Sequence, residues 1–218
     1  MSEVKLRLES LKKAVARVEF LMPKSILKRY AAFRVGATDM EKRAYHLGDS
    51  VMLTFDDYGN SSQVKQILKV LAENGVKAMF FVQGDWAEKS PELIDQIRKA
   101  GHMIGNHTYS HQDLKSLTDE EVREEIRRGP QSKWLRPPRG RYNDRIRQIA
   151  AEFGQVICYW DTDSDDWMGV SKDAIVRKVV TEVKPGSVVL LHIHAAHTAE
   201  ALPEVIAGIR GRGFEVAS

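Results

Sequence analysis

From residue 49 to the C-terminus, short apolar runs alternate with segments that have helical periodicity. We interpret the apolar runs as buried strands at residues 51–55, 78–82, 102–105, 134–135, 156–160, 188–193 and 214–217. Helices are predicted near residues 61–74, 90–100, 118–128, 143–153, 171–183 and 198–211. Strict alternation implies right-handed parallel crossovers, which leaves either a doubly wound sheet or a closed barrel. Seven strands with polar residues after most of them favour the barrel.

Residues 1–48 show a different pattern. Apolar residues recur there at alternating spacings of four and three, at Val4, Leu8, Leu11, Val15, Val18 and Met22. This spacing predicts an N-terminal helical extension, residues 1–48, ahead of a barrel domain, residues 49–218. Packing against the barrel is the favoured role of the extension. Contact with an anionic membrane surface or with a second subunit is the alternative, and the oligomeric state is left open.

Composition and charge exclude some classes of protein. The 218 residues, 43% of them hydrophobic, suffice for one sizeable core. A net charge of +3, from 33 basic and 30 acidic side chains, is too small to indicate a nucleic-acid partner. The single Cys158 cannot form an intramolecular disulfide. Because the N-terminal residues lack a secretory pattern, we expect a cytoplasmic protein; a chain that had lost its leader would look the same and would be exported or surface-associated.

Two of the predicted strands are followed by residues of the types that commonly bind metal ions in proteins. The first ends in the adjacent carboxylates Asp56 and Asp57, which at the mouth of a core need a cation, a proton-sharing partner or water. The third is followed by His107 and His111, whose imidazoles would converge on one ion if the segment coiled into a turn of helix. One carboxylate and two imidazoles leave a position open for water, as in hydrolytic metal centres.

Polar residues also follow later strands. Two prolines at 137–138 stiffen the loop that holds Arg136, and a stiff loop suits backbone amides aimed at an oxyanion; an ordinary Pro-Gly turn is the alternative. Residues 160–167 are rich in acids and bracketed by tryptophans, which beside a cleft stack on sugars or wall an apolar slot. His192 ends a buried strand, where it can act as a proton donor or as a core histidine. The remaining histidines are interpreted as helix-end, turn or surface residues: His46, His102, His194 and His197.

Five stretches, in this order, resemble the polysaccharide deacetylase family, also called the NodB-homology domain or carbohydrate esterase family four. They are Thr54–Asp57, His107–His111, Arg136–Gly140, Asp166–Trp167 and Leu190–His192. The resemblance covers roughly residues 49–218. It implies a distorted (β/α)7-type barrel that catalyses metal-dependent hydrolysis of N-acetyl, sometimes O-acetyl, groups on amino sugars.

The resemblance also implies roles for individual residues. A divalent metal would be held by Asp57, His107 and His111. The catalytic residues would be Asp56 as general base, Arg136 that orients it, His192 as proton donor to the leaving amine, and Asp166 that tunes His192. The backbone N–H of residue 139 would help to hold the oxyanion. The residues expected to line the substrate are Tyr58, Arg139, Tyr142, Trp167 and Leu190.

Three positions depart from the family pattern. Tyr58 stands where the family usually has Gly, and it places a ring beside the expected base. Arg139 replaces a usual aromatic residue, adding a cation that favours an anionic substrate. Ile193 follows His192 where Asp is common. None of these changes removes an expected ligand or proton-transfer group, so they bear on substrate identity more than on reaction type.

The leading hypothesis is therefore a metal-dependent deacetylase that acts on an N-acetylated carbohydrate. Zinc is the favoured ion, with cobalt, nickel or manganese as alternatives. A second hypothesis is a hydrolase of small cyclic amides or ureides, since relatives in the same superfamily hydrolyse such bonds, some without a metal. A third is a non-catalytic carbohydrate-binding or membrane-associated scaffold in which residues 1–48 are the working part.

Overall fold

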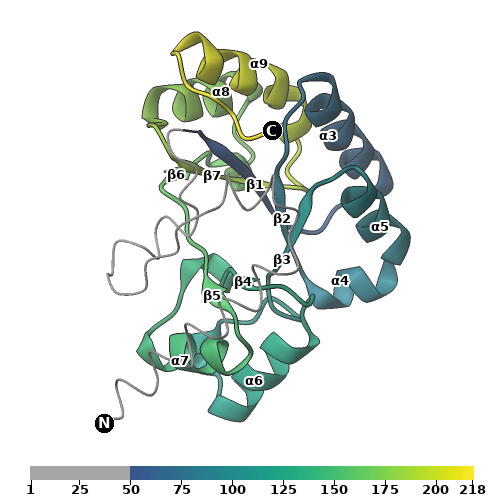
Figure 1. The fold of residues 1–218 in the computed structure, drawn as a ribbon, viewed down its shortest axis with the longest axis vertical. Coiled ribbons are helices and arrows are strands. Elements are labelled where there is room, and N and C mark those ends of the chain that lie inside the picture. The colour runs from purple at the N-terminus through teal and green to yellow at the C-terminus, as the bar shows by residue number, and fades with distance from the viewer. Residues whose placement is uncertain (1–49) are drawn as a thin grey trace.

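The computed structural model describes residues 50–218, so the predicted extension at residues 1–48, including His46, lies outside the described residues. The described chain forms a parallel sheet in the order β5-β4-β3-β2-β1-β7-β6 (Figure 1). Its strands are β1 (Met52–Asp57), β2 (Met79–Val82), β3 (Met103–Asn106), β4 (Trp134–Leu135), β5 (Val156–Ile157), β6 (Thr162–Asp163) and β7 (Val188–His192). From β6 through β7 and β1 to β5, neighbouring strands follow one another around the sheet in a circular version of the chain order. The sheet is open only between β5 and β6. The prediction of a distorted seven-stranded barrel is confirmed, and the doubly wound alternative is excluded.

The crossover connections contain the predicted helices. These are α3 (Ser61–Glu73), α5 (Pro91–Lys99), α6 (Asp119–Arg128), α7 (Asp144–Glu152), α8 (Lys172–Glu182) and α9 (Thr198–Gly211). Local sequence explains where several of them begin. Asn60 and Gln63 form a capping box at α3, and Thr118 and Glu121 form another at α6. Helix α4 (Gly84–Lys89) was not predicted, because six residues carry too little periodicity to be recognised.

The structure corrects the predicted strands at the end of the chain. Residues 214–217 were expected to form a strand, but they contribute only an isolated bridge between Val216 and Val51. The seventh strand is instead β6, which pairs with β7. The predicted strand at 156–160 is reduced to the two residues of β5. Strands of two residues are defined by their partners rather than by their own pattern, so sequence periodicity does not find them.

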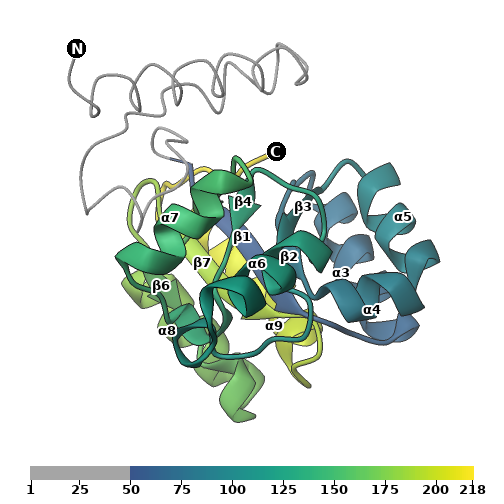
Figure 2. The same cartoon turned by 90° about the horizontal axis from the view of Figure 1, so that it is seen from below.

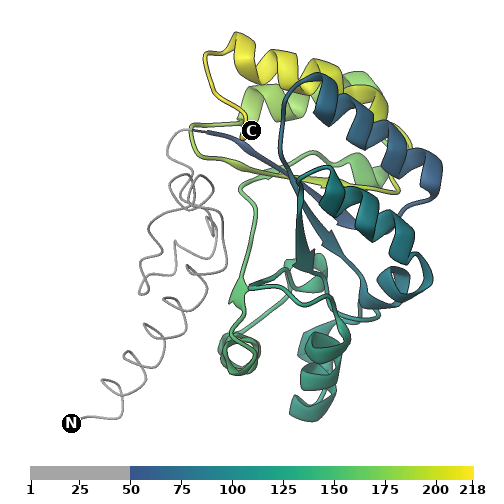
Figure 3. The ribbon, with the colours of Figure 1, turned by 45° about the vertical axis from the view of Figure 1, so that its right-hand side comes forward.

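Helices cover the outside of the sheet in two groups. Figure 1 shows α3, α5, α8 and α9 around β1, β2 and β7, where they share one large apolar cluster with these strands. Helices α6 and α7 form a separate pair beside β4 and β5, with an apolar cluster of their own (Figures 1 and 3). In Figure 2, α3, α4 and α5 stand together on one side of the molecule. None of the helices in the described part of the chain is long and apolar enough to span a bilayer.

Candidate functional site

Strand alternation brings two of the candidate residues together on the inner face of the sheet. In β1, Leu53 and Phe55 pack outward against the helices, whereas Met52 belongs to the cluster inside the sheet. Side chains alternate along a strand, so Asp56 faces the same inner side as Met52. Asp56 is also the register partner of His192 in the neighbouring strand β7. The carboxylate expected to act as base and the imidazole expected to act as acid are therefore neighbours.

Asp57 is turned towards the two histidines by an unusual backbone conformation. Its φ angle of 74° lies in the left-handed region, which is costly for a residue with a Cβ and recurs at functional sites. Its Oδ1 lies 3.4 Å from Nε2 of both His107 and His111. The same oxygen accepts a hydrogen bond from Nε2 of Gln83 at 3.1 Å. The strained turn thus directs one carboxylate oxygen to the point where the imidazoles meet.

The two histidines converge through an irregular loop, residues 107–111, which we call the histidine loop. A turn of helix was considered as the way for the two imidazoles to converge, but this segment is not helical, and Thr108 and His111 have φ angles of 64° and 60°. Thr108 Oγ1 accepts a hydrogen bond from the backbone N–H of His111 at 3.2 Å. Asn106 Oδ1 accepts one from the N–H of Thr108 at 2.8 Å. Side-chain hydrogen bonds therefore fix a turn that brings both rings to one side.

Glu125 of helix α6 holds the histidine loop from behind, and the sequence analysis did not identify it. Its side chain is buried and accepts hydrogen bonds from the backbone N–H groups of Tyr109 and Ser110, at 3.1 and 2.9 Å. It also accepts bonds from the hydroxyl of Ser110 at 2.6 Å and from Nε2 of Gln112 at 3.3 Å. A buried carboxylate amid so many donors is stabilised by them, and in turn it restrains the residue that precedes His111.

The three clustered side chains fit a divalent metal ion. One ligand atom from each of Asp57, His107 and His111 lies within 4.8 Å of the other two. The carbonyl of Arg136 lies 2.7 Å from Nδ1 of His107 and can only accept, so Nδ1 carries the proton and Nε2 presents its lone pair to the cluster. A carboxylate oxygen and two imidazole nitrogens match catalytic sites that keep one coordination position open.

Charges within the cluster shift its pKa values. Burial raises the pKa of Asp57, but the contact with His107 and the charges of the other histidines outweigh it, leaving the pKa well below its usual range. Burial lowers the pKa of His107, yet Asp56 and Asp57 together raise it above its usual value. Burial, and then the charge of His107, lower the pKa of His111. The carboxylates of Asp56 and Asp57 thus favour positive charge at His107. A metal cation and a proton would compete for the lone pair of its Nε2.

Arg136 lies fully buried beside Asp56. Its Nη1 donates to Oδ1 of Asp56 at 2.7 Å and to Oγ1 of Thr54 at 2.8 Å. Its Nε donates to the carbonyl of Cys158 at 3.3 Å, and the guanidinium stacks 4.0 Å from the centre of the Phe81 ring. A charge so deeply buried persists only with a compensating partner, so Arg136 and Asp56 hold each other in place.

His192 is oriented by Asp166 of the short 3-10 helix η3 (Asp166–Met168). The two oxygens of Asp166 accept hydrogen bonds from the backbone N–H and from Nδ1 of His192, each at 2.7 Å, and the hydroxyl of Thr198 also donates to Asp166. Nε2 of His192 is left facing the site, 4.0 Å from Oδ2 of Asp57. Burial lowers the pKa of His192, but the hydrogen bond and charge of Asp166 raise it to about 9. The hydrogen bond and charge of Asp166 therefore favour the protonated form of the imidazole.

Three of the residues expected to bind substrate lie close in the chain to Asp57, Asp166 or His192. Tyr58 follows Asp57 directly, and its side chain is half exposed. Trp167 follows Asp166 and is more than half exposed. Leu190 is buried in β7, two residues before His192. An exposed aromatic ring therefore stands beside each of two groups assigned to the chemistry.

The other two expected substrate residues differ from each other in placement. Arg139 lies in η2 (Pro138–Gly140), exposed and with a left-handed φ of 57°, and its charge contributes to the lowered pKa of His111. Arg139 therefore acts on the histidine side of the cluster. Tyr142 packs against the apolar cluster of α6 and α7, and its ring centre lies 6.2 Å from that of Tyr159. The structure thus places Tyr142 against the helices α6 and α7 and beside Tyr159.

The structure brings one further histidine to the site. His194 was grouped with the helix-end, turn and surface histidines, but its Nδ1 lies only 3.6 Å from Oδ2 of Asp57. The sequence does contain a signal that places His194 near the site. It lies two positions after His192, and side chains two apart in an extended strand point to the same face. His102 is buried, accepts a hydrogen bond from the N–H of Ala78 and has its pKa lowered to about 4, mainly by burial. His197 is exposed and pairs with Glu200.

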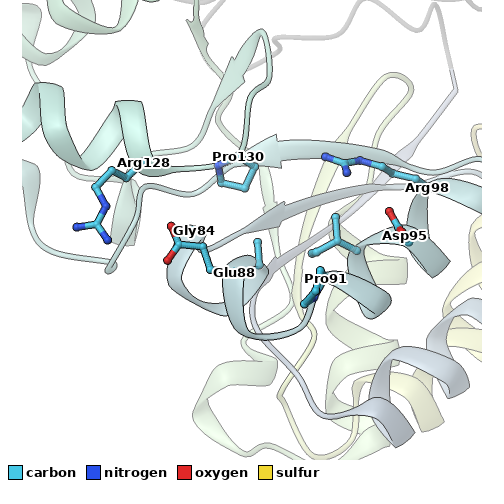
Figure 4. Close-up of a pocket in the computed structure, with 9 residues that line it drawn as sticks. Gly84, Glu88, Pro91, Asp95, Arg98, Arg128 and Pro130 are labelled. Carbon is cyan, nitrogen blue, oxygen red and sulfur yellow. The ribbon is translucent and has the colours of Figure 1, made fainter.

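A separate hollow lies between α4, α5 and the segment after α6 (Figure 4). Its lining includes acidic and basic side chains in equal number: Glu88, Asp95, Arg98 and Arg128. The guanidinium of Arg128 also covers the ring of Tyr109 in the histidine loop, 3.5 Å from its centre. The hollow contains none of the clustered ligands, and its opposite charges offset one another.

Comparison with known proteins places these features in a family. The family model described as polysaccharide deacetylase matches residues 45–157. A peptidoglycan-N-acetylglucosamine deacetylase of Bacillus cereus is 35% identical over 192 residues, which cover 80% of this chain and 70% of that protein. The family model therefore covers β1 to β5, and the Bacillus relative extends the similarity over most of the described chain.

Solved structures share the fold. A family 4 carbohydrate esterase from Streptomyces lividans, in complex with acetate, matches with a TM-score of 0.73 and 34% identity, covering 78% of this chain and 92% of that one. A mutant of a CE4 family pseudoenzyme with restored enzymatic activity matches with a TM-score of 0.75 and 30% identity, covering 78% of this chain and 65% of that one. The fold is thus shared by an esterase and by a protein described as a pseudoenzyme, so the site itself has to carry the argument for activity.

Proposed function

Because the chain belongs to the polysaccharide deacetylase family, we propose that it is a metal-dependent hydrolase that removes N-acetyl groups from an amino sugar or polysaccharide. The observation that carries this proposal is the convergence of a three-ligand cluster, a buried carboxylate and an imidazole at the ends of adjoining strands. Membership alone would not suffice, since a similar structure is that of a CE4 family pseudoenzyme from Bacillus anthracis. In this chain the three candidate ligands lie together, and Asp56 and His192 are partners in neighbouring strands.

Asp57, His107 and His111 would hold the ion. Their mixed set of one oxygen and two nitrogens suits zinc, with cobalt, nickel or manganese as alternatives. When bound, such an ion polarises the acyl oxygen and makes water acidic enough to attack at neutral pH. The proposed metal dependence therefore rests on the donor types and their spacing.

The protein groups on either side of the cluster would move the protons. Asp56, held by Arg136, would take a proton from the attacking water. His192 would deliver a proton from Nε2 to the leaving nitrogen, because Asp166 occupies Nδ1 and keeps the ring charged. Such delivery is essential, since an amide nitrogen leaves only as a neutral amine. The backbone N–H of Arg139 is proposed to stabilise the oxyanion.

The substrate residues suggest which sugars would be preferred. Tyr58 and Trp167 offer exposed rings for stacking on a sugar face, and buried Leu190 offers an apolar wall for the acetyl group. Arg139 would add a positive charge on the histidine side of the site, in line with its contribution to the lowered pKa of His111. This charge favours a saccharide that carries a carboxylate over a neutral one.

The test is acetate release by the Zn²⁺-loaded protein from N-acetylated chitooligosaccharides and from peptidoglycan fragments. Asp56→Asn and His192→Ala are each expected to lose most of the activity, because each removes one proton-transfer group. Glu204→Gln, which alters an exposed ion pair with Lys172 on α8, is the control and should retain activity. Activity that survives both site variants would show that the assigned roles are wrong.

A further inference from the structure

His194 is an imidazole of the site to which the proposed mechanism gives no task. Its Nδ1 is buried and has no hydrogen-bond partner within residues 50–218. That nitrogen lies 3.6 Å from Oδ2 of Asp57, the carboxylate oxygen that does not face His107 and His111. Leaving a buried polar nitrogen unpaired costs free energy, so its direction towards a carboxylate calls for an explanation.

The backbone around His194 is held in place from two sides. The carbonyl of His194 accepts a hydrogen bond from Nε2 of Gln63 at 2.8 Å, and Oε1 of the same Gln63 caps helix α3 by accepting from the N–H of Asn60. At Gly59 a Cβ would collide with the side chain of Ile193, so the loops that follow β1 and β7 pack directly on each other. The position of His194 next to Asp57 is therefore built into the fold.

The ring of His194 is also held in orientation. It stacks on Tyr58, with ring centres 5.1 Å apart and planes inclined by 15°. It also meets His192 edge to face, with ring centres 5.7 Å apart. The stack with Tyr58 restrains the plane of the ring. In this orientation Nδ1 lies on the side of Asp57.

We propose that His194 is a positioning residue for Asp57, with Tyr58 as its support. With a proton on Nδ1, His194 donates to Oδ2 and thereby keeps Oδ1 directed at His107 and His111. A shift of about 0.6 Å brings the present 3.6 Å separation to hydrogen-bond length. His192 is farther from the same oxygen, at 4.0 Å. The inference rests on the proposed function only in taking Asp57 as a metal ligand.

Residues that hydrogen-bond to a metal ligand commonly contribute roughly 10- to 100-fold to metal affinity. The test is therefore the dissociation constant for Zn²⁺, measured by competition between the full-length protein and a chelating dye. His194→Ala is expected to weaken Zn²⁺ binding by about 10-fold or more. Tyr58→Ala should weaken it less, because it removes only the support. His197→Ala, an exposed histidine paired with Glu200, is the matched control and should bind as the unaltered protein does.

Two further variants separate positioning from a general packing role. An Asn side chain places its amide nitrogen near the position of Nδ1, whereas Gln reaches towards that of Nε2. His194→Asn should therefore restore most of the Zn²⁺ affinity, and His194→Gln should not. Equal affinities of these two variants, or a His194→Ala protein that binds as tightly as the His197→Ala control, would overturn the inference.

Asp57→Ala separates this inference from the proposed function. If Asp57→Ala abolishes Zn²⁺ binding while His194→Ala does not weaken it, only the role of His194 is wrong. If Asp57→Ala leaves the affinity unchanged, the ligand set of the proposed function is wrong, and the role of His194 falls with it. A protein that binds Zn²⁺ in the expected order of variants but releases no acetate refutes the proposed activity and leaves the positioning role intact.

Discussion

Replacing Glu125 is expected to loosen the histidine loop without touching any proposed ligand. The buried carboxylate accepts two backbone N–H groups of the loop, from Tyr109 and Ser110, on one of its oxygens. Its other oxygen accepts the hydroxyl of Ser110 and the amide of Gln112. In Glu125→Ala all four donors lose their acceptor. In Glu125→Gln the remaining oxygen keeps both backbone donors, and the new amide can donate to the hydroxyl.

The magnitude follows from these contacts. A hydrogen bond to a charged group contributes roughly 1.5–3 kcal/mol, but the loop is only half-buried, so water replaces part of what is lost. We expect Glu125→Ala to lower the free energy of unfolding by about 2–4 kcal/mol and Glu125→Gln by about 1 kcal/mol. Because His111 directly follows Ser110 and has a left-handed backbone, the alanine variant should also bind Zn²⁺ more weakly.

The measurement is urea unfolding of each variant, with Zn²⁺ dissociation constants determined on the same preparations. Glu124→Ala is the matched control, since Glu124 is the preceding residue of α6 and pairs with Arg127 at the surface. It should cost less than about 1 kcal/mol. If Glu125→Ala destabilised the protein no more than Glu124→Ala, or if alanine and glutamine at position 125 behaved alike, the assignment of Glu125 as the support of the loop would be refuted.

Three other measurements follow from the structure. Arg136→Met should lower the free energy of unfolding by about 3–5 kcal/mol, because it leaves Asp56 buried without its cation; an unchanged urea midpoint would contradict this. Because the pKa of His102 is lowered to about 4, this residue binds fewer protons in the folded protein than in the unfolded chain between pH 6.5 and about 4. The free energy of unfolding therefore falls as the pH falls through that range, by at most about 1.4 kcal/mol per pH unit. His102→Gln should have a flatter pH dependence of unfolding, and an identical slope would rule out His102 as its source. Zn²⁺ at one hundred times its dissociation constant should raise the free energy of unfolding by about 2.7 kcal/mol, and Asp57→Ala should abolish this gain; a gain that persists would place the ion elsewhere.

Much of the fold could be predicted because its signals are local. Six long helices have their own periodicity and, at Thr118 and Asn143, their own caps. The strands β1 and β7 are apolar runs long enough to recognise. Helix α4 and strand β6 were missed for the opposite reason, since each is too short to carry a pattern and exists because neighbouring elements pair or pack with it.

The composition of the candidate site was predictable, but its support was not. Asp57, His107 and His111 stand at recognisable spacings after strands, and the structure brings their ligand atoms together. The way in which the two imidazoles converge was not foreseen. The histidine loop is not helical: Thr108 and His111 have left-handed backbones, and Glu125 of α6 holds the loop. No sequence pattern near Glu125 indicates its contact with the histidine loop, because the contact joins residues 15 positions apart.

The sequence by itself determined which chemical groups this protein carries and that they follow parallel strands, since strand alternation and helical periodicity are written in neighbouring residues. Only the tertiary structure decided how those groups are aimed. Asp57 takes a left-handed backbone, Arg136 crosses the inner face of the sheet to Asp56, and His194 comes from the loop after β7 to Asp57. The reason is physical, because these contacts join residues many positions apart and form only when loops from different strands pack against one another.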